Sequence, residues 1–197
     1  FYTGGTTVNG GTLRMGNVNA LGGDTGFNGA LTVNGGTLDI FGVGNASIGT
    51  LSGSGGAISD SGFFSGSSVV STYSLADSAY AGAINDGNFR ALSLYKDGTG
   101  ILTLTGASNY SGVTKVFEGA VRLGSNAGLG SAAGATVVSS GAAVQVSGNI
   151  VSSEPFTVAG TGTSATTGVL RNISDTNTLG GAAGGIDARL VLAGQCQ

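Results

Sequence analysis

The sequence predicts an all-β protein built as a parallel β-solenoid, in which short strands form coils that stack on one another. Three observations support this prediction: the chain repeats itself, β-branched runs alternate with turn residues throughout, and similar segments recur about one coil apart. Because the units of an array bury their apolar faces only against neighbouring units, internal repetition outweighs any local pattern. We therefore expect residues 1–197 to form one segment of a longer array.

The clearest repeat relates residues 2–22 to residues 110–130, 108 positions later. Nine of the 21 positions are identical without a gap: Tyr2/Tyr110, Gly4/Gly112, Thr6/Thr114, Val8/Val116, Gly11/Gly119, Arg14/Arg122, Gly16/Gly124, Leu21/Leu129 and Gly22/Gly130. We place repeat copies near 2–42 and 96–148, with a distinct segment, 63–95, between them. A second similarity, between 6–13 and 31–38, has a spacing of 25 residues, about the contour length of one coil.

The predicted strands are short runs rich in Thr, Val, Ile and Leu, separated by the turn formers Gly, Asn, Ser and Asp. No segment has the pattern of a helix. The expected strands are 6–8, 12–15, 31–33, 37–41, 48–51, 57–59, 69–73, 92–94, 101–105, 114–117, 120–123, 136–138, 142–146, 156–158, 169–173 and 190–192.

Alternation within these runs leaves other all-β folds open. In 101–104 and 144–146 one set of side chains would face a core, which fits a sandwich or a barrel as well as a solenoid. Asn9-Gly10 and Asn34-Gly35 have the composition of type I′ turns, which would make the sheet antiparallel. In a stack of coils these pairs would instead mark corners, and small Ser, Thr and Ala would fill a narrow interior.

The solenoid prediction has a mutational consequence. Leu102 and Leu104 should face inward, so replacing either by Asp would bury an unpaired charge and unfold neighbouring coils. Ser111 lies at an expected corner, and Ser111→Asp should matter far less.

Composition argues against several classes of function. Only 9% of residues are charged, the net charge is −3, and the seven Lys and Arg are scattered singly, so nucleic acid is not an expected partner. No apolar run approaches the roughly 18 residues of a membrane-spanning helix, and the first residues lack signal-peptide features. With no His and one cysteine, Cys196, we expect no disulfide within the chain and no Cys/His metal site. Cys196 would be a free thiol in a frayed tail or pair between molecules.

Segment 63–95 holds six of the thirteen aromatic residues: Phe63, Phe64, Tyr73, Tyr80, Phe89 and Tyr95. These rings could fill a wider part of the core or form an exposed contact patch. Because large apolar side chains are usually buried, the core is the favoured prediction.

The titratable residues do not form a recognisable catalytic motif. The acidic residues occur singly, mostly beside Gly or Ser, and are expected in turns or in solvent rather than as a catalytic pair: Asp24, Asp39, Asp60, Asp77, Asp86, Asp97, Glu118, Glu154, Asp175 and Asp187. The densest charge cluster is Asp86, Arg90, Lys96 and Asp97. It could converge in a polysaccharide-cleaving site on adjacent coils or form a surface salt-bridge network.

Gly-rich segments add no ligand site to this prediction. Residues 180–185 lack the following Lys of a phosphate loop, and the Gly-Gly-containing segments 55–60 and 184–187 are too isolated to be calcium-binding repeats. The sequence therefore predicts no catalytic, cofactor-binding or metal-binding residue and no cofactor.

Residues 96–115, followed by 119–124, resemble the autotransporter-associated β-strand repeat of bacterial autotransporter passengers. Residues 51–58 and 80–87 resemble the segments that precede this repeat. The close match covers 96–130, and a partial copy spans 2–42. Phe117-Glu118 departs from the usual Asn-Gly type of corner, which predicts a turn unlike that at Asn9-Gly10. After Gly148 the resemblance thins.

The resemblance implies a right-handed parallel β-helix that is exported across two membranes and displayed outside the cell by a protein anchored in the bacterial outer membrane. The expected function is a non-enzymatic structural and adhesive stalk, with a glycan or host surface protein as partner and no membrane insertion by this segment. Exposed terminal coils would favour end-to-end self-association. The alternative is a polysaccharide-active parallel β-helix enzyme.

Overall fold

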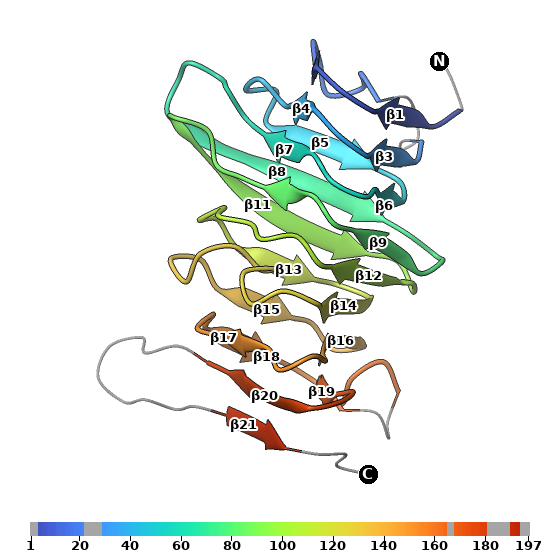
Figure 1. Cartoon of the computed structure of the whole chain (residues 1–197), viewed down its shortest axis with the longest axis vertical. Coiled ribbons are helices and arrows are strands. Elements are labelled where there is room, and N and C mark those ends of the chain that lie inside the picture. The colour runs from blue at the N-terminus through green and yellow to red at the C-terminus, as the bar shows by residue number, and fades with distance from the viewer. Residues whose placement is uncertain (1–3, 22–28, 165–167, 181–189, 194–197) are drawn as a thin grey trace.

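A computed structural model describes residues 4–21, 29–164, 168–180 and 190–193, the last of these by their backbone alone. All regular elements in these ranges are strands, stacked coil upon coil (Figure 1). Asp24, Asp187 and Cys196 lie outside the described residues.

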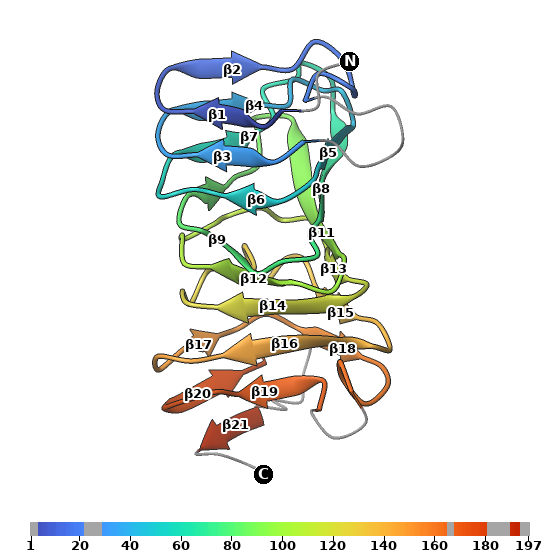
Figure 2. The same ribbon diagram turned by 90° about the vertical axis from the view of Figure 1, so that its right-hand side faces the viewer.

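The strands form three faces, seen together in Figures 1 and 2. Face 1 contains β1 (Thr6–Val8), β3 (Leu31–Val33), β6 (Leu51–Ser52), β9 (Ser78–Tyr80), β12 (Ile101–Leu104), β14 (Gly119–Leu123), β16 (Ala142–Val146) and β19 (Leu170–Asn172). Face 2 contains β2 (Thr12–Arg14), β4 (Thr37–Asp39), β7 (Ala57–Ser59) and β10 (Ala83–Ile84), and further along β17 (Val151–Ser152), β20 (Thr176–Leu179) and β21 (Leu190–Ala193). Face 3 contains β5 (Asn45–Ile48), β8 (Gly66–Tyr73), β11 (Arg90–Asp97), β13 (Thr114–Val116), β15 (Thr136–Val138) and β18 (Phe156–Val158).

Neighbouring strands run parallel, which confirms the solenoid and rules out the sandwich and barrel alternatives. Thr6 pairs with Leu31 and Thr12 with Thr37, and the stacked Asn9 and Asn34 have the same separation of 25 residues, the predicted length of the first coil. Later coils vary in length, from the short step between Ile101 and Ala120 to the long step between Val151 and Thr178. The chain makes about seven turns, which wind in a right-handed sense in Figures 1 and 2. Among the described strands only β20 and β21 pair antiparallel.

The Asn-Gly pairs are stacked corners, so the hairpin prediction is wrong. The backbone N–H of Asn34 donates to the Val8 carbonyl at 2.9 Å, and the Asn34 side-chain amide donates to Asn9 Oδ1 at 3.0 Å. Each corner passes the chain from face 1 to face 2 instead of reversing it. Gly36 has φ 71°, and a Cβ there would lie 2.3 Å from the Gly11 carbonyl oxygen, so both conformation and stacking require glycine.

The two copies of the repeat, 108 positions apart in the sequence, lie on different faces. Thr6–Val8 is on face 1, whereas its counterpart Thr114–Val116 is on face 3. The matching glycines at the following corner, Gly11 and Gly119, have φ values of 66° and 65°. Phe117-Glu118 therefore does not alter the conformation of the glycine after it. The repeat encodes a strand–corner–strand unit that can be placed at more than one corner of the coil.

Most predicted strands are found, with small shifts at their ends. The predicted strand 48–51 is wrong because it spans a corner: β5 ends at Ile48, and β6 begins at Leu51. Four strands were missed: β9, β10, β17 and β20. These strands are short, and their Ser, Ala and Asn residues interrupt any β-branched run. They form strands mainly because they pair with neighbouring coils, which the local sequence does not reveal.

The interior is mainly aliphatic, not filled by small residues as predicted. Leu38, Ile58 and Ile84 pair in register along face 2, and all three are completely buried. Leu102 and Leu104 are inward as expected, at 1% and 3% exposed. Each such burial stabilises the coil by about 1.5–3 kcal/mol. Small polar residues face inward mainly on face 3, at Ser68, Thr72, Thr114 and Thr136.

Candidate functional site

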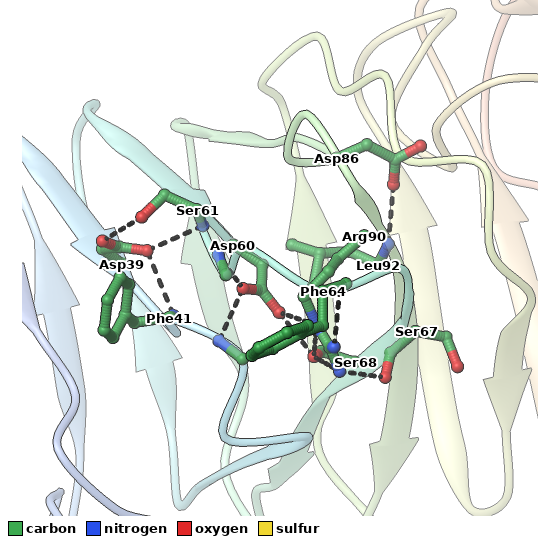
Figure 3. Close-up of polar contacts among 12 residues, drawn as sticks. Asp39, Phe41, Asp60, Ser61, Phe64, Ser67, Ser68, Asp86, Arg90 and Leu92 are labelled. Atoms are coloured by element: carbon green, nitrogen blue, oxygen red, sulfur yellow. Dashed lines mark hydrogen bonds and ion pairs between the residues drawn. The ribbon is translucent and has the colours of Figure 1, made fainter.

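The predicted cluster of Asp86, Arg90, Lys96 and Asp97 does not converge on an open groove. Asp86 accepts hydrogen bonds from the backbone N–H of Leu92 at 2.6 Å and from the Ser111 hydroxyl at 2.5 Å, and it points away from Arg90 (Figure 3). Asp97 accepts from the backbone N–H of Gly98 at 2.8 Å. Asp86 therefore joins two coils, whereas Asp97 bonds within its own corner.

Lys96 is completely buried at the end of β11. Its Nζ donates to the carbonyls of Asp97 at 2.9 Å, Gly98 at 2.6 Å and Glu118 at 3.3 Å, and so links corners of two successive coils. Burial lowers its pKa to about 8, although the carboxylates of Asp97, Glu118 and Asp77 oppose this shift. Lys96 is thus a staple within the solenoid and does not face a substrate.

Arg90 pairs with Asp60, a partner that sequence reasoning did not give it. The Arg90 Nε lies 3.0 Å from Asp60 Oδ2, and Nη1 and Nη2 donate to the carbonyls of Phe64 at 3.2 Å and Ser67 at 2.9 Å. Ser68 Oγ accepts from both Nε and Nη2 at 3.2 Å. The guanidinium therefore fixes the loop before β8 (Figure 3).

Asp60 has no exposed surface and joins two corners. Its Oδ1 accepts from the backbone N–H groups of Gly42 at 2.7 Å and Gly62 at 2.9 Å, and its Oδ2 accepts from the Ser68 hydroxyl at 2.5 Å. The bond to Gly62, two residues on, is the expected turn-forming contact of an Asp. Asp60 is therefore a turn-forming residue, as predicted, but it is buried and not in solvent.

Asp39 also joins two corners, one coil earlier than Asp60, and is 2% exposed. Its Oδ1 accepts from the backbone N–H groups of Phe41 at 3.1 Å and Ser61 at 2.9 Å, while Oδ2 accepts from Ser61 Oγ at 2.7 Å and Arg14 Nε at 2.9 Å. Burial disfavours the ionised form, but these hydrogen bonds outweigh burial and lower the pKa of Asp39.

The corner built on these carboxylates presents four phenylalanines, which we call the Phe corner: Phe41, Phe63, Phe64 and Phe89. They lie in the loops before β5, β8 and β11, in three consecutive coils. Phe63, Phe64 and Phe89 are 72%, 82% and 59% exposed, so the prediction that the aromatic segment fills the core is wrong for them. Of the aromatic residues of that segment, Tyr80 alone is completely buried, whereas Tyr73 and Tyr95 are half-buried.

A small pocket of about 160 Å³ opens at this corner, lined by Phe41, Gly42, Gly62, Phe63, Phe64 and Arg90. Phe41 meets Phe63 edge to face at 5.5 Å, and the Arg14 guanidinium lies 4.0 Å from the centre of the Phe41 ring. A Cβ on Gly62 would come within 2.8 Å of Gly42 Cα, so glycine lets the two corners close up beneath the rings. The pocket has the size of a cavity that holds one benzene ring.

A second buried carboxyl, Glu154, lies before β18 and is 3% exposed. Its Oε1 accepts from the Thr136 hydroxyl at 3.0 Å, and its Oε2 has no hydrogen-bond partner among the described residues. Burial raises its pKa to about 7, opposed in part by the Thr136 hydrogen bond. Nearby, burial raises the pKa of Tyr110, and the Glu154 charge adds to this shift, while a hydrogen bond of 2.6 Å between the Tyr110 and Thr114 hydroxyls opposes it. The expectation of a solvated residue is wrong for Glu154.

The described ranges hold no group of three His, Cys, Asp or Glu residues placed to bind a metal ion. Over the same ranges no helix is long and apolar enough to cross a membrane.

Comparison with known proteins gives one family. The passenger-associated-transport-repeat matches residues 1–15, 20–40 and 94–123, which fall within both predicted repeat copies except at Leu94, Tyr95 and Phe1. The third match runs from the end of β11 to the end of β14 and includes the Lys96 staple. Searches of curated proteins and of solved structures gave no match. The match confirms the resemblance over these residues, which are similar to the passenger-associated-transport-repeat.

Proposed function

We propose that this chain is a structural and adhesive stalk segment of an autotransporter passenger, displayed on a bacterial cell surface and without enzymatic activity. The observation that carries the proposal is the continuity of the parallel pairing, which runs along face 3 from β5 to β18 without a break. The described residues of the passenger repeat build coils and corners, which supports a structural role.

A stalk of this kind gains its stiffness from backbone hydrogen bonds and from side chains that join one coil to the next. Lys96, Asp39, Asp60 and Asp86 each bond groups on a neighbouring coil. With strands about 4.8 Å apart, seven turns give a rod on the order of 35 Å long. In this proposal the rod holds a functional tip away from the cell or presents its own surface to a glycan or host protein.

The polysaccharide-active alternative predicts that Asp86, Arg90, Lys96 and Asp97 face a common open space. Their hydrogen-bonding groups are instead engaged within the solenoid, which supports the stalk. Incubation of the purified chain with a panel of acidic polysaccharides tests this point, and depolymerisation would contradict the proposal.

Display and the role of coils can be tested together. The chain is placed between an epitope tag and an outer-membrane barrel, and antibody binding to intact cells reports export. Deleting residues 101–119 removes one coil and brings Ala120 to the position of Ile101, so the rod should shorten by about 4.8 Å with display retained. Deleting residues 101–110 instead breaks the register and should lower display. Equal tolerance of the two deletions, or no display of the intact chain, would contradict the stalk.

A further inference from the structure

The Phe corner exposes more apolar surface than the fold requires. Phe64 is 82% exposed and Phe89 is 59% exposed, on loops of adjacent coils. Single exposed apolar residues are common on proteins, but a contiguous group marks an interaction surface. Phe63 and Phe64 line one pocket, and the loop of Phe89 adjoins theirs, because the Phe89 carbonyl accepts from the backbone N–H of Gly66 at 3.3 Å.

The loops that carry the rings are held in place before any partner arrives. Asp39 and Asp60 bind four backbone N–H groups of the two corners, and Arg90 binds the carbonyls of Phe64 and Ser67 (Figure 3). A surface fixed in this way loses little conformational entropy when it is covered, which favours binding.

The chemistry of the pocket favours an apolar side chain as its occupant. Small-molecule sites combine apolar walls with a few free polar groups that orient the ligand. Here Arg90 supplies the polar side chain of the lining, and its Nε, Nη1 and Nη2 already donate to Asp60, Phe64, Ser67 and Ser68. The remaining side chains of the lining are phenylalanines. The volume of about 160 Å³ suits a single ring.

The same surface supplies both a ring-sized pocket and, on the adjoining loop, Phe89, a 59% exposed ring that is not part of the pocket lining. This combination is self-complementary, as a two-fold contact between identical chains requires, because each copy can insert a ring and receive one. Charge does not oppose the contact: Arg14 is paired with Asp39, and Arg90 with Asp60. We propose that the Phe corner binds the Phe corner of a second copy, side by side, with Phe89 of each copy in the pocket of the other.

The area involved predicts a weak association. A phenylalanine side chain buries about 150–250 Å², so three rings at these exposures offer on the order of 400 Å² per copy. Two copies would bury on the order of 800 Å², below the roughly 1,000 Å² of a stable interface. We therefore expect dimers with a dissociation constant between ~10 µM and ~1 mM. This contact requires only the folded chain and goes beyond the stalk role. The dimer proposal and the stalk proposal can therefore fail independently.

Sedimentation velocity of the purified chain from ~10 µM to ~1 mM tests the association in solution. The wild type should shift from monomer to dimer, and Phe64→Ser with Phe89→Ser should weaken the dimer by about tenfold or more. Leu75→Ser is the matched control, because Leu75 is 65% exposed on another corner, and it should leave the dimer unchanged. A monomeric wild type over this range, or equal effects of the control and the Phe variants, would overturn the proposal.

Cysteine cross-linking locates the contact. In a Cys196→Ser background, Ser65→Cys, at an exposed position beside Phe64 that leaves the rings in place, should form a disulfide-linked dimer on mild oxidation, and Leu75→Cys should not. Circular dichroism confirms that each variant is folded. A Ser65→Cys chain that stays monomeric while the wild type dimerises would place the interface elsewhere, for example at the terminal coils, and would contradict the proposal. NMR titration distinguishes a glycan partner. If the signals of the Phe corner shift on addition of soluble oligosaccharides but not with protein concentration, the surface binds a glycan, and the proposal is contradicted.

Discussion

Asp60 and Arg90, 30 residues apart in sequence, form an ion pair in which the Asp60 side chain has no exposed surface and the Arg90 side chain is 13% exposed. One coil earlier Asp39 and Arg14 form the equivalent pair, but 54% of the Arg14 side chain is exposed. The two pairs have nearly the same geometry, at 3.0 and 2.9 Å, and differ mainly in burial. They offer an internal comparison of what burial does to an ion pair.

Arg90→Ala should destabilise the chain by about 3–5 kcal/mol, because it leaves the Asp60 carboxylate buried without its cation. Arg14→Ala should cost less, about 1 kcal/mol, because water screens the charge of the half-exposed Arg14 side chain, although Asp39 itself is buried. Urea unfolding followed by circular dichroism gives both free energies of unfolding. Equal losses for the two variants would show that burial does not decide the strength of these pairs.

Inward and outward positions of β12 should differ sharply in their tolerance of charge. Leu104 is 3% exposed, and Leu104→Asp buries an unpaired carboxylate, so the coils around β12 should unfold. Thr103→Asp, one position away, points outward and lies in register with Arg122, so the fold should be retained. Hydrogen exchange, resolved by residue, measures which coils open. Loss of protection in both variants would contradict the side-chain assignment on face 1.

The fold could be predicted from sequence because its signals are local and repeated. Thr6–Val8 and Leu31–Val33 are β-branched or aliphatic runs bounded by Asn and Gly, and the spacing between them in the sequence is the register found in the structure. The Asn-Gly pairs were ambiguous because the positive φ of a hairpin turn also suits a corner. The choice between them depends on pairing with other coils, which the local sequence does not contain.

The contacts of the corners could not be predicted, because their partners are one coil away and coil length varies. Asp60 and Arg90 are 30 residues apart, and neither the 24-residue step from Gly66 to Arg90 nor the 20-residue step from Thr37 to Ala57 gives that spacing. Without these lengths the sequence grouped Arg90 with Asp86, its neighbour along the chain. The exposure of Phe63 and Phe64 was missed for a related reason: hydrophobicity predicts burial, and only the corner's position shows that both rings lie outside the coil.

The structure changes the expectation for Ser111. Its backbone N–H and hydroxyl both donate to Asp86, at 3.0 and 2.5 Å, so Ser111→Asp would place two carboxylates side by side. We now expect Ser111→Asp to destabilise the corner by about 1–3 kcal/mol at pH 7, and Ser111→Ala by about 1 kcal/mol through the lost hydrogen bond. Urea unfolding at pH 7 measures both. Ala107→Asp, at an exposed position of the same loop, is the control and should be nearly neutral.

Glu154 should make stability depend on pH near neutrality. Its pKa is about 7 in the folded chain and about 4.5 when unfolded, so between these values the folded state binds more protons than the unfolded state. The free energy of unfolding should therefore fall as the pH rises from 4.5 to 7, by about 2–3 kcal/mol, and level off above 7. Asp39, with its lowered pKa, acts below this window, and Lys96, with a pKa of about 8, acts above it.

Glu154→Gln isolates this effect, because the amide keeps the shape of the side chain and cannot ionise. The difference in the free energy of unfolding between Glu154→Gln and wild type should grow from pH 4.5 to pH 7, with the variant more stable at pH 8. Tyr110 is the titratable side chain coupled to Glu154 among the described residues, and its pKa is raised further from this window, so Tyr110→Phe should keep the wild-type slope. Parallel pH profiles for wild type and Glu154→Gln would mean that the Glu154 carboxyl reaches water and titrates with its ordinary pKa.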